Sequence, residues 1–146
     1  MPKLKPYKMK KMILLAVAFV SFAALTSCSN EDESASLLGK WEYLKQGTVT
    51  NGQEVLTDYI PQTGCSKNYS MITSTTIMDH TFNGSDCFEA ISNQPYTREG
   101  NVLTVTGENN IYTFEIKTLN SNTLKIYLTY IDSEPSSQVF VFKRIN

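Results

Sequence analysis

The sequence predicts an all-β domain, an antiparallel meander that closes into a barrel or packs as a sandwich. Residues 111–119 and 124–130 alternate apolar and polar side chains, as strands with one buried face do. Turn signals such as Asn83-Gly84 recur at short intervals, and no stretch after Leu38 keeps a helical period over a dozen residues. Roughly eight to ten short strands joined by sequential hairpins account for this pattern.

Residues 1–27 have the form of a signal peptide. Five lysines precede an apolar run at residues 12–25. That run is shorter than the roughly 20 residues that a membrane span requires, but it suits a signal peptide. Translation starts at Met1, Met9 or Met12, since the segment MKKMILL alone has the required lysines and apolar run.

The apolar run ends in Leu25-Thr26-Ser27-Cys28, which resembles the bacterial lipobox of an aliphatic residue, two small residues and a cysteine. The resemblance implies that the Cys28 thiol accepts a diacylglyceryl group and that Cys28 becomes the first residue after cleavage. The alternative is an ordinary secretory signal followed by a chance cysteine. A lipid on Cys28 makes the membrane a partner of the protein.

Residues 28–36 are polar, acidic and rich in small side chains, so they predict a flexible tether. Ser29 directly after the cysteine is similar to the sorting signal for the outer membrane. The acidic cluster resembles the surface-export tethers of Bacteroidetes lipoproteins, with ordinary linker composition as the alternative. We therefore expect a lipid-anchored protein of the outer membrane that faces the periplasm or the cell surface.

The charge balance excludes one class of partner. The whole chain has a formal net charge of −1, but removal of residues 1–27 leaves 8 basic and 14 acidic side chains, a net of −6. Without a basic patch, nucleic-acid binding is not expected. The acidic surface mainly favours solubility.

Less regular patterns mark the N-terminal half of the domain. We expect a short helical turn at residues 36–38, ahead of the first strand. Glycine, proline and asparagine interrupt residues 45–66, so only a weak strand is expected there, at residues 54–59. Residues 71–82 are rich in Thr, Ile and Met and form one or two strands.

After Asn83-Gly84 the predicted strands follow one another closely. Residues 87–91 come directly after that turn. A second turn, at residues 98–101, separates a strand at residues 96–97 from one at residues 102–105. The last strand, at residues 139–142, is apolar on both sides.

The hairpin of residues 111–119 and 124–130 has a clear inner face, made of Tyr112, Phe114 and Ile116 on one strand and of Leu124, Ile126, Leu128 and Tyr130 on the other. Tyr127 falls on the polar face. It either joins a surface for a partner or covers a neighbouring strand.

Cys65 and Cys87 remain after Cys28 is assigned to lipid. In an exported protein such a pair usually forms a disulfide, here one that closes a loop of about 23 residues and stabilises the fold by roughly 3 kcal/mol. The alternative is a metal or redox site. Neither cysteine belongs to a CxxC motif, and His80 is the single histidine.

The start of the first strand, Leu38-Gly39-Lys40-Trp41, resembles the Gly-x-Trp signature of lipocalins. The resemblance implies that Trp41 lies at the closed end of a barrel, with an arginine of the last strand packed over it. Arg144 is placed to do this, because it falls on the same side of the last strand as Phe140 and Phe142. Such a cation–π contact contributes roughly 0.5–2 kcal/mol.

The order of motifs along the chain is similar to that of the lipocalin-like domain lipoproteins of Bacteroidetes. The shared features are the lipobox, the acidic tether, the Gly39 and Trp41 signature, two mid-chain cysteines, the segment at residues 96–104 and the terminal Lys143-Arg144. This resemblance implies a small lipocalin-like barrel of about eight strands at residues 37–146.

The sequence offers little for catalysis or metal binding. Asp79 and His80 are an acid and a base, but neighbours on a strand point to opposite faces. Asp79, Asp86 and Glu89 have no calcium-loop spacing and are expected to be solvated turn acids. We therefore expect a protein that is not an enzyme, with no catalytic residues, no metal and no cofactor.

Two functions of different classes remain. The first is a binder of a small apolar or amphipathic ligand inside the barrel, with binding residues that the sequence does not name. The second is a structural or protein-interaction lipoprotein with a filled barrel and an unknown protein partner. The interior volume discriminates between them, since ligand cavities begin at roughly 300 Å³.

Overall fold

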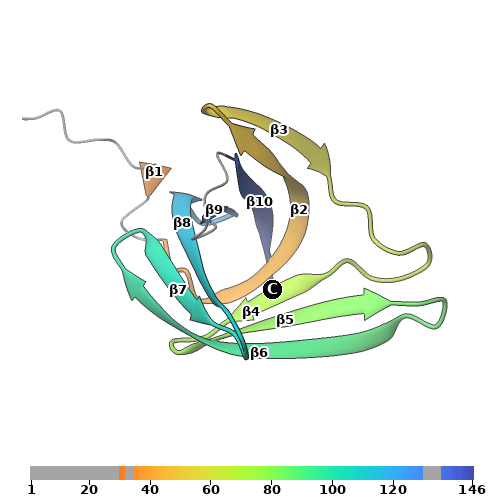
Figure 1. The fold of residues 1–146 in the computed structure, drawn as a ribbon. Helices are drawn as coiled ribbons and strands as arrows, with labels where there is room; N and C mark the ends of the chain where they lie inside the picture. Colours follow the sequence, from red (N-terminus) through yellow and green to blue (C-terminus); the bar gives the residue numbers. More distant parts are fainter. Residues whose placement is uncertain (1–29, 32–34, 130–135) are drawn as a thin grey trace, which may run out of the picture.

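A computed structural model describes residues 30–31, 35–129 and 136–146 (Figure 1). The predicted signal peptide, Cys28, most of the predicted tether and Tyr130 lie outside these residues. The described part of the chain contains strands, turns and loops and no helix. Its strands are β1 Asn30–Glu31, β2 Gly39–Thr50, β3 Gln53–Asp58, β4 Tyr69–Ile72, β5 Thr76–Asn83, β6 Phe88–Glu99, β7 Val102–Thr106, β8 Ile111–Leu119, β9 Thr123–Thr129 and β10 Ser136–Ile145.

Eight antiparallel strands form a closed barrel. The order is β8–β7–β6–β5–β4–β2–β10–β9, and pairing of β9 with β8 completes the circuit. The sequence prediction of a closed antiparallel meander is therefore confirmed. β1 pairs in parallel with the end of β8, outside the circuit. In the described part of the chain, no helix is long and apolar enough to cross a membrane.

The barrel has one closed end, at Trp41. This side chain is 0% exposed, and its Nε1 donates a hydrogen bond of 2.8 Å to the Leu37 carbonyl. The Arg144 guanidinium lies 4.1 Å from the Trp41 ring centroid, as the lipocalin resemblance implied. Gly39 has φ +130°, and a Cβ there would lie 2.7 Å from Arg144 Nη1, so the signature glycine makes room for the arginine.

Residues 36–38 do not form the expected helical turn. Arg144 donates to the carbonyls of Ser36 and Leu38, and Trp41 donates to that of Leu37. Side chains therefore satisfy the carbonyls that a helical turn would have used.

The expected strands at residues 87–91 and 96–97 are one continuous strand, β6. Pro95 is tolerated inside it because the Tyr96 amide donates to the Thr75 carbonyl, on the β5 side. The nitrogen of Pro95 therefore faces the other side, where pairing with β7 begins only at Tyr96.

β2 pairs with β10 along one edge and with two strands in turn along its other edge. Its first half pairs with β4 and its second half with β3, where only a weak strand was predicted. At Gly47 the strands β2 and β3 are so close that a Cβ on this residue would lie 1.8 Å from the Val55 carbonyl oxygen. Val139 of β10 points away from the barrel interior, yet it is 0% exposed. The Glu54 carboxylate of β3 accepts a hydrogen bond from the Lys125 ammonium of β9. We conclude that β3 folds over the outer face of β10.

Candidate functional site

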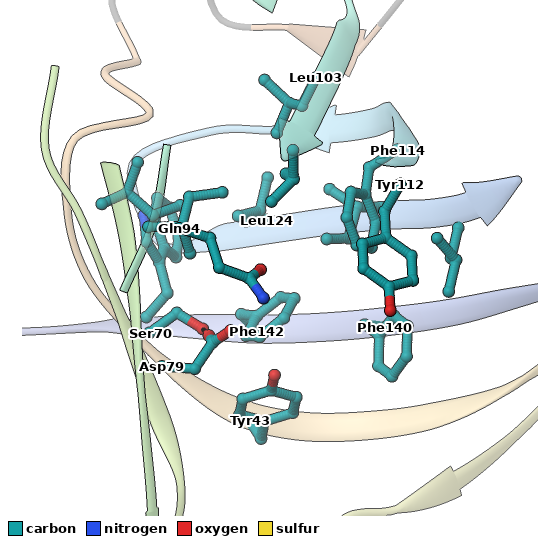
Figure 2. A pocket seen from close by; sticks show the side chains of 16 residues that line it. Tyr43, Ser70, Asp79, Gln94, Leu103, Tyr112, Phe114, Leu124, Phe140 and Phe142 are labelled. Carbon is teal, nitrogen blue, oxygen red and sulfur yellow. Dashed lines mark hydrogen bonds between the residues drawn. The ribbon is translucent and has the colours of Figure 1, made fainter. Parts of the chain in front are cut away.

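The barrel encloses a cavity of about 280 Å³ beyond Trp41 (Figure 2). Trp41, Leu103 and Leu124 contribute to its apolar lining at the closed end, and Phe114, Phe140 and Phe142 contribute aromatic rings. The polar lining side chains are Tyr43, Ser70, Asp79, Gln94 and Tyr112. The space is therefore mainly apolar, with a limited polar region.

Strand alternation places these side chains. Tyr112 and Phe114 of β8 line the cavity, as do Leu124, Ile126 and Leu128 of β9. The inner face predicted for this hairpin is confirmed for its described residues. Ile116 belongs to the buried core beside the cavity. An inner face of this kind follows from local sequence, because side chains alternate along any strand.

Ser70 and Asp79 form the polar centre of the cavity. They are direct partners in the pairing of β4 with β5, so their side chains share the inner face. The Ser70 hydroxyl donates a hydrogen bond to the Asp79 carboxylate (Figure 2). Burial raises the pKa of Asp79 above its ordinary value, although the Ser70 hydrogen bond and the nearby His80 act in the opposite direction.

Tyr43 adds a second ionisable group to this region. Burial raises the pKa of its hydroxyl well above the ordinary value, and the negative charge of Asp79 raises it further. The ring packs between neighbours, with centroid distances of 4.6 Å to Phe142 and 5.4 Å to Tyr59. Tyr43 therefore stays a neutral hydroxyl that can donate or accept a hydrogen bond.

Asp79 and His80 lie on opposite faces of β5. Asp79 lines the cavity, whereas His80 stacks on Tyr69 with ring centroids 4.3 Å apart. Nδ1 of His80 lies 2.7 Å from Oε1 of Glu89. The predicted opposite faces of these two residues are thus observed, and Asp79 is separated from Glu89 as well.

The expectation that Asp79 is a solvated turn acid is wrong. It occupies the middle of β5 and faces the barrel interior. A signal was present in the sequence, because Ile77 and Asp79 fall on the same face of an alternating strand. What the sequence did not reveal is that this face points inward, which depends on the pairing with β4.

A disulfide joins Cys65 and Cys87, with a Cα–Cα distance of 5.3 Å, as predicted. It connects the loop after β3 to the turn between β5 and β6, and neither cysteine lines the cavity. Among the described residues, no three or more His, Cys, Asp or Glu side chains gather as a metal site would require.

Tyr127 lies on the outer face and contacts β3 there. Its hydroxyl donates to the Glu54 carboxylate, and Lys117 Nζ lies 4.9 Å from its ring centroid. Burial and the hydrogen bond to Glu54 raise the pKa of Tyr127 to about 12. Of the two predicted roles for Tyr127, covering a neighbouring segment is the one that these contacts support.

Comparisons with known proteins bear on the fold. No protein-family model matches the chain, and no curated protein matches it. A solved lipocalin-like protein from Bacteroides uniformis superposes with a TM-score of 0.51 at 14% identity, covering 75% of this chain and 98% of its own. An uncharacterized protein from Bacteroides eggerthii superposes with a TM-score of 0.51 at 12% identity, covering 75% of this chain and 100% of its own. The chain therefore has a lipocalin-like fold, similar to that of proteins from Bacteroides.

Proposed function

We propose that this protein is a lipid-anchored lipoprotein of the cell envelope that binds a small amphipathic ligand inside its barrel, without catalysis. The observation that carries the proposal is the cavity of about 280 Å³, with aromatic walls and a polar region around Asp79. Most ligand pockets are apolar clefts with a few placed polar groups, and this cavity has that character.

The size of the cavity restricts the ligand. Its volume lies just below the roughly 300–1,000 Å³ typical of pockets for drug-sized molecules. We therefore expect a small ligand, or one whose end protrudes from the barrel. The alternative function, a partner-binding lipoprotein with a filled barrel, is less well supported because the interior side chains leave this space open.

Native mass spectrometry tests the proposal directly. Residues 29–146, which contain the entire closed barrel, are produced in the periplasm and measured before and after denaturing extraction. We expect an added mass that disappears on denaturation and that identifies the ligand class. A protein that carries no added mass and takes up no apolar probe contradicts ligand binding and favours the partner-binding alternative.

A matched pair of variants localises the binding. Val105 of β7 lines the cavity, whereas Val102 of the same strand faces outward and is exposed. Val105→Phe should fill the cavity and abolish ligand uptake, while Val102→Phe should leave uptake unchanged. Equal uptake by the two variants would place the ligand elsewhere.

A further inference from the structure

Among the described residues, the side chains that line the cavity can carry negative charge but not positive charge. Asp79 is its one carboxyl group, and none of the 16 described lining residues is Lys, Arg or His. Arg144 is not among the lining residues, and its guanidinium donates to the carbonyls of Ser36, Leu38 and Ser121. A molecule that enters the cavity therefore meets a potential negative charge and no basic side chain among these residues.

Asp79 also has unused hydrogen-bonding capacity. An ionised carboxylate offers about four acceptor sites. Among the described residues, the Ser70 hydroxyl is the donor that the carboxylate binds. Figure 2 shows the Tyr43 hydroxyl and the Gln94 amide pointing into the same space. The polar centre is thus arranged to receive a donor from a bound molecule.

The energetic cost of Asp79 indicates what that donor is. A carboxylate in a mainly apolar space is unfavourable unless it is paired. A ligand cation would supply the missing pair, whereas a ligand anion would place a second negative charge beside Asp79 with no basic lining side chain to compensate. A neutral ligand would leave the carboxylate with its hydrogen bond from Ser70 but without a compensating positive charge.

We propose that the ligand is an amphiphile with a protonated amine, whose ammonium group donates to the Asp79 carboxylate while its apolar part lies against Phe140, Phe142 and Leu124. The inference rests on the proposed function, since it names the class of ligand for the same cavity. A fatty-acid anion, by contrast, would find no basic side chain among the described lining residues.

Three probes with the same apolar chain test the inference: octylamine, octanol and octanoate. Binding to residues 29–146 is followed by the fluorescence of Trp41, the single tryptophan, which lines the cavity. We expect octylamine to bind at least about tenfold more tightly than octanol, because a hydrogen bond between charged partners is stronger than a neutral one. Octanoate should bind most weakly.

Two variants assign the preference to one carboxyl group. Asp79→Asn keeps the shape and an acceptor for Ser70 but removes the charge, so its preference for octylamine should disappear. Asp58→Asn makes the same change at an exposed carboxyl outside the cavity and should keep the preference. Trp41 emission and thermal unfolding verify that both variants are folded.

The outcomes distinguish this inference from the proposed function. If octanol and octanoate bind as tightly as octylamine to the unaltered protein, the amine inference is overturned and ligand binding stands. If none of the probes binds the folded protein, both fall. If Asp79→Asn retains the preference, Asp79 is not the group that recognises the amine. The comparison of probes on the unaltered protein does not depend on any variant.

Discussion

Asp79 is a carboxyl group inside a mainly apolar barrel, and its ionisation links the stability of the fold to pH. Burial raises its pKa in the folded state above the value in the unfolded chain. The folded protein therefore holds this proton more tightly than the unfolded protein does. Its contribution to stability is fully present below the unfolded pKa and is lost as pH rises through the folded pKa.

Asp79→Asn removes this loss. We expect the variant to gain stability over the unaltered protein as pH rises from about 3.9, the unfolded value, to neutrality, since Asn has no proton to lose. Urea unfolding of both proteins across this range measures the difference.

Asp58→Asn is the control for the sign of that effect. Lys45 lowers the pKa of Asp58. Any contribution of Asp58 to the stability of the fold is therefore present above the unfolded pKa and lost as pH falls. If the difference between Asp79→Asn and the unaltered protein does not change with pH, Asp79 is not buried as described.

Arg144 stabilises the closed end by its shape as well as by its charge. Its planar guanidinium lies over Trp41 and donates to three backbone carbonyls. Arg144→Lys keeps the charge but cannot reproduce this geometry. We expect a loss of about 1–3 kcal/mol in the free energy of unfolding, measured with urea. The exposed neighbour Lys143 provides the control, since Lys143→Ala should change the free energy of unfolding by less than about 0.5 kcal/mol. Equal losses in the two variants would contradict this role of Arg144.

At the scale of elements, the hairpin of β2 and β3 depends on Gly47. A Cβ at this position would meet backbone atoms of Val55 and Leu56, which cannot move aside as a flexible side chain can. Gly47→Ala should therefore displace β3, uncover Val139 and destabilise the fold by about 1–3 kcal/mol. Faster hydrogen exchange in β3 and a lower free energy of unfolding would report this. Thr48→Ala, at an adjacent exposed position, is the control and should change neither the hydrogen exchange of β3 nor the free energy of unfolding. Unchanged hydrogen exchange in Gly47→Ala would show that β3 does not lie over β10.

The disulfide links two segments that are distant in sequence, and its cysteines are 22 residues apart. Cys65→Ser with Cys87→Ser should lower the free energy of unfolding by about 3 kcal/mol, because the unfolded chain gains freedom. Ligand uptake should persist at temperatures where the variant is folded, since neither cysteine lines the cavity. Urea unfolding with and without a reducing agent measures the first effect and probe binding the second. Loss of binding in the folded variant would show that the disulfide also shapes the cavity.

At the scale of the whole molecule, the N-terminal approach to the barrel lies at its closed end. Arg144 donates a hydrogen bond to the Ser36 carbonyl there. β1 pairs with the last residues of β8, and these lie close to Leu124, which belongs to the same buried core as Trp41. A lipid on Cys28 would therefore bring the membrane to this end and leave the opposite end of the barrel open to solvent.

The anchor itself has a direct test. Cells given a radioactive fatty acid should label the unaltered protein and the Cys65→Ser, Cys87→Ser double variant, because both retain Cys28. Cys28→Ala should not be labelled, since no thiol remains next to the cleavage site. Equal labelling of Cys28→Ala and the unaltered protein, or no labelling of either, would reject the lipoprotein assignment.

The sequence by itself determined the features that depend on local pattern. Alternation along β8 and β9 identified their inner faces, and the Gly39 and Trp41 signature, read with Arg144, predicted the contact at the closed end. The pairing of Cys65 with Cys87 was predicted from export and from the assignment of Cys28 to lipid, which leaves these two cysteines. The inner faces follow from side-chain periodicity, and the cysteine pair follows from a residue type with few structural uses. The contact at the closed end follows from the resemblance to lipocalins.

Only the tertiary structure decided the features that depend on register and closure. The sequence did not predict the continuity of β6, the fold of β3 over β10, or the position of Asp79 beside Ser70. The volume of the cavity also emerged only when the barrel closed. The physical reason is that register brings together residues far apart in the chain, and the space left between side chains is a property of the closed barrel rather than of any one strand.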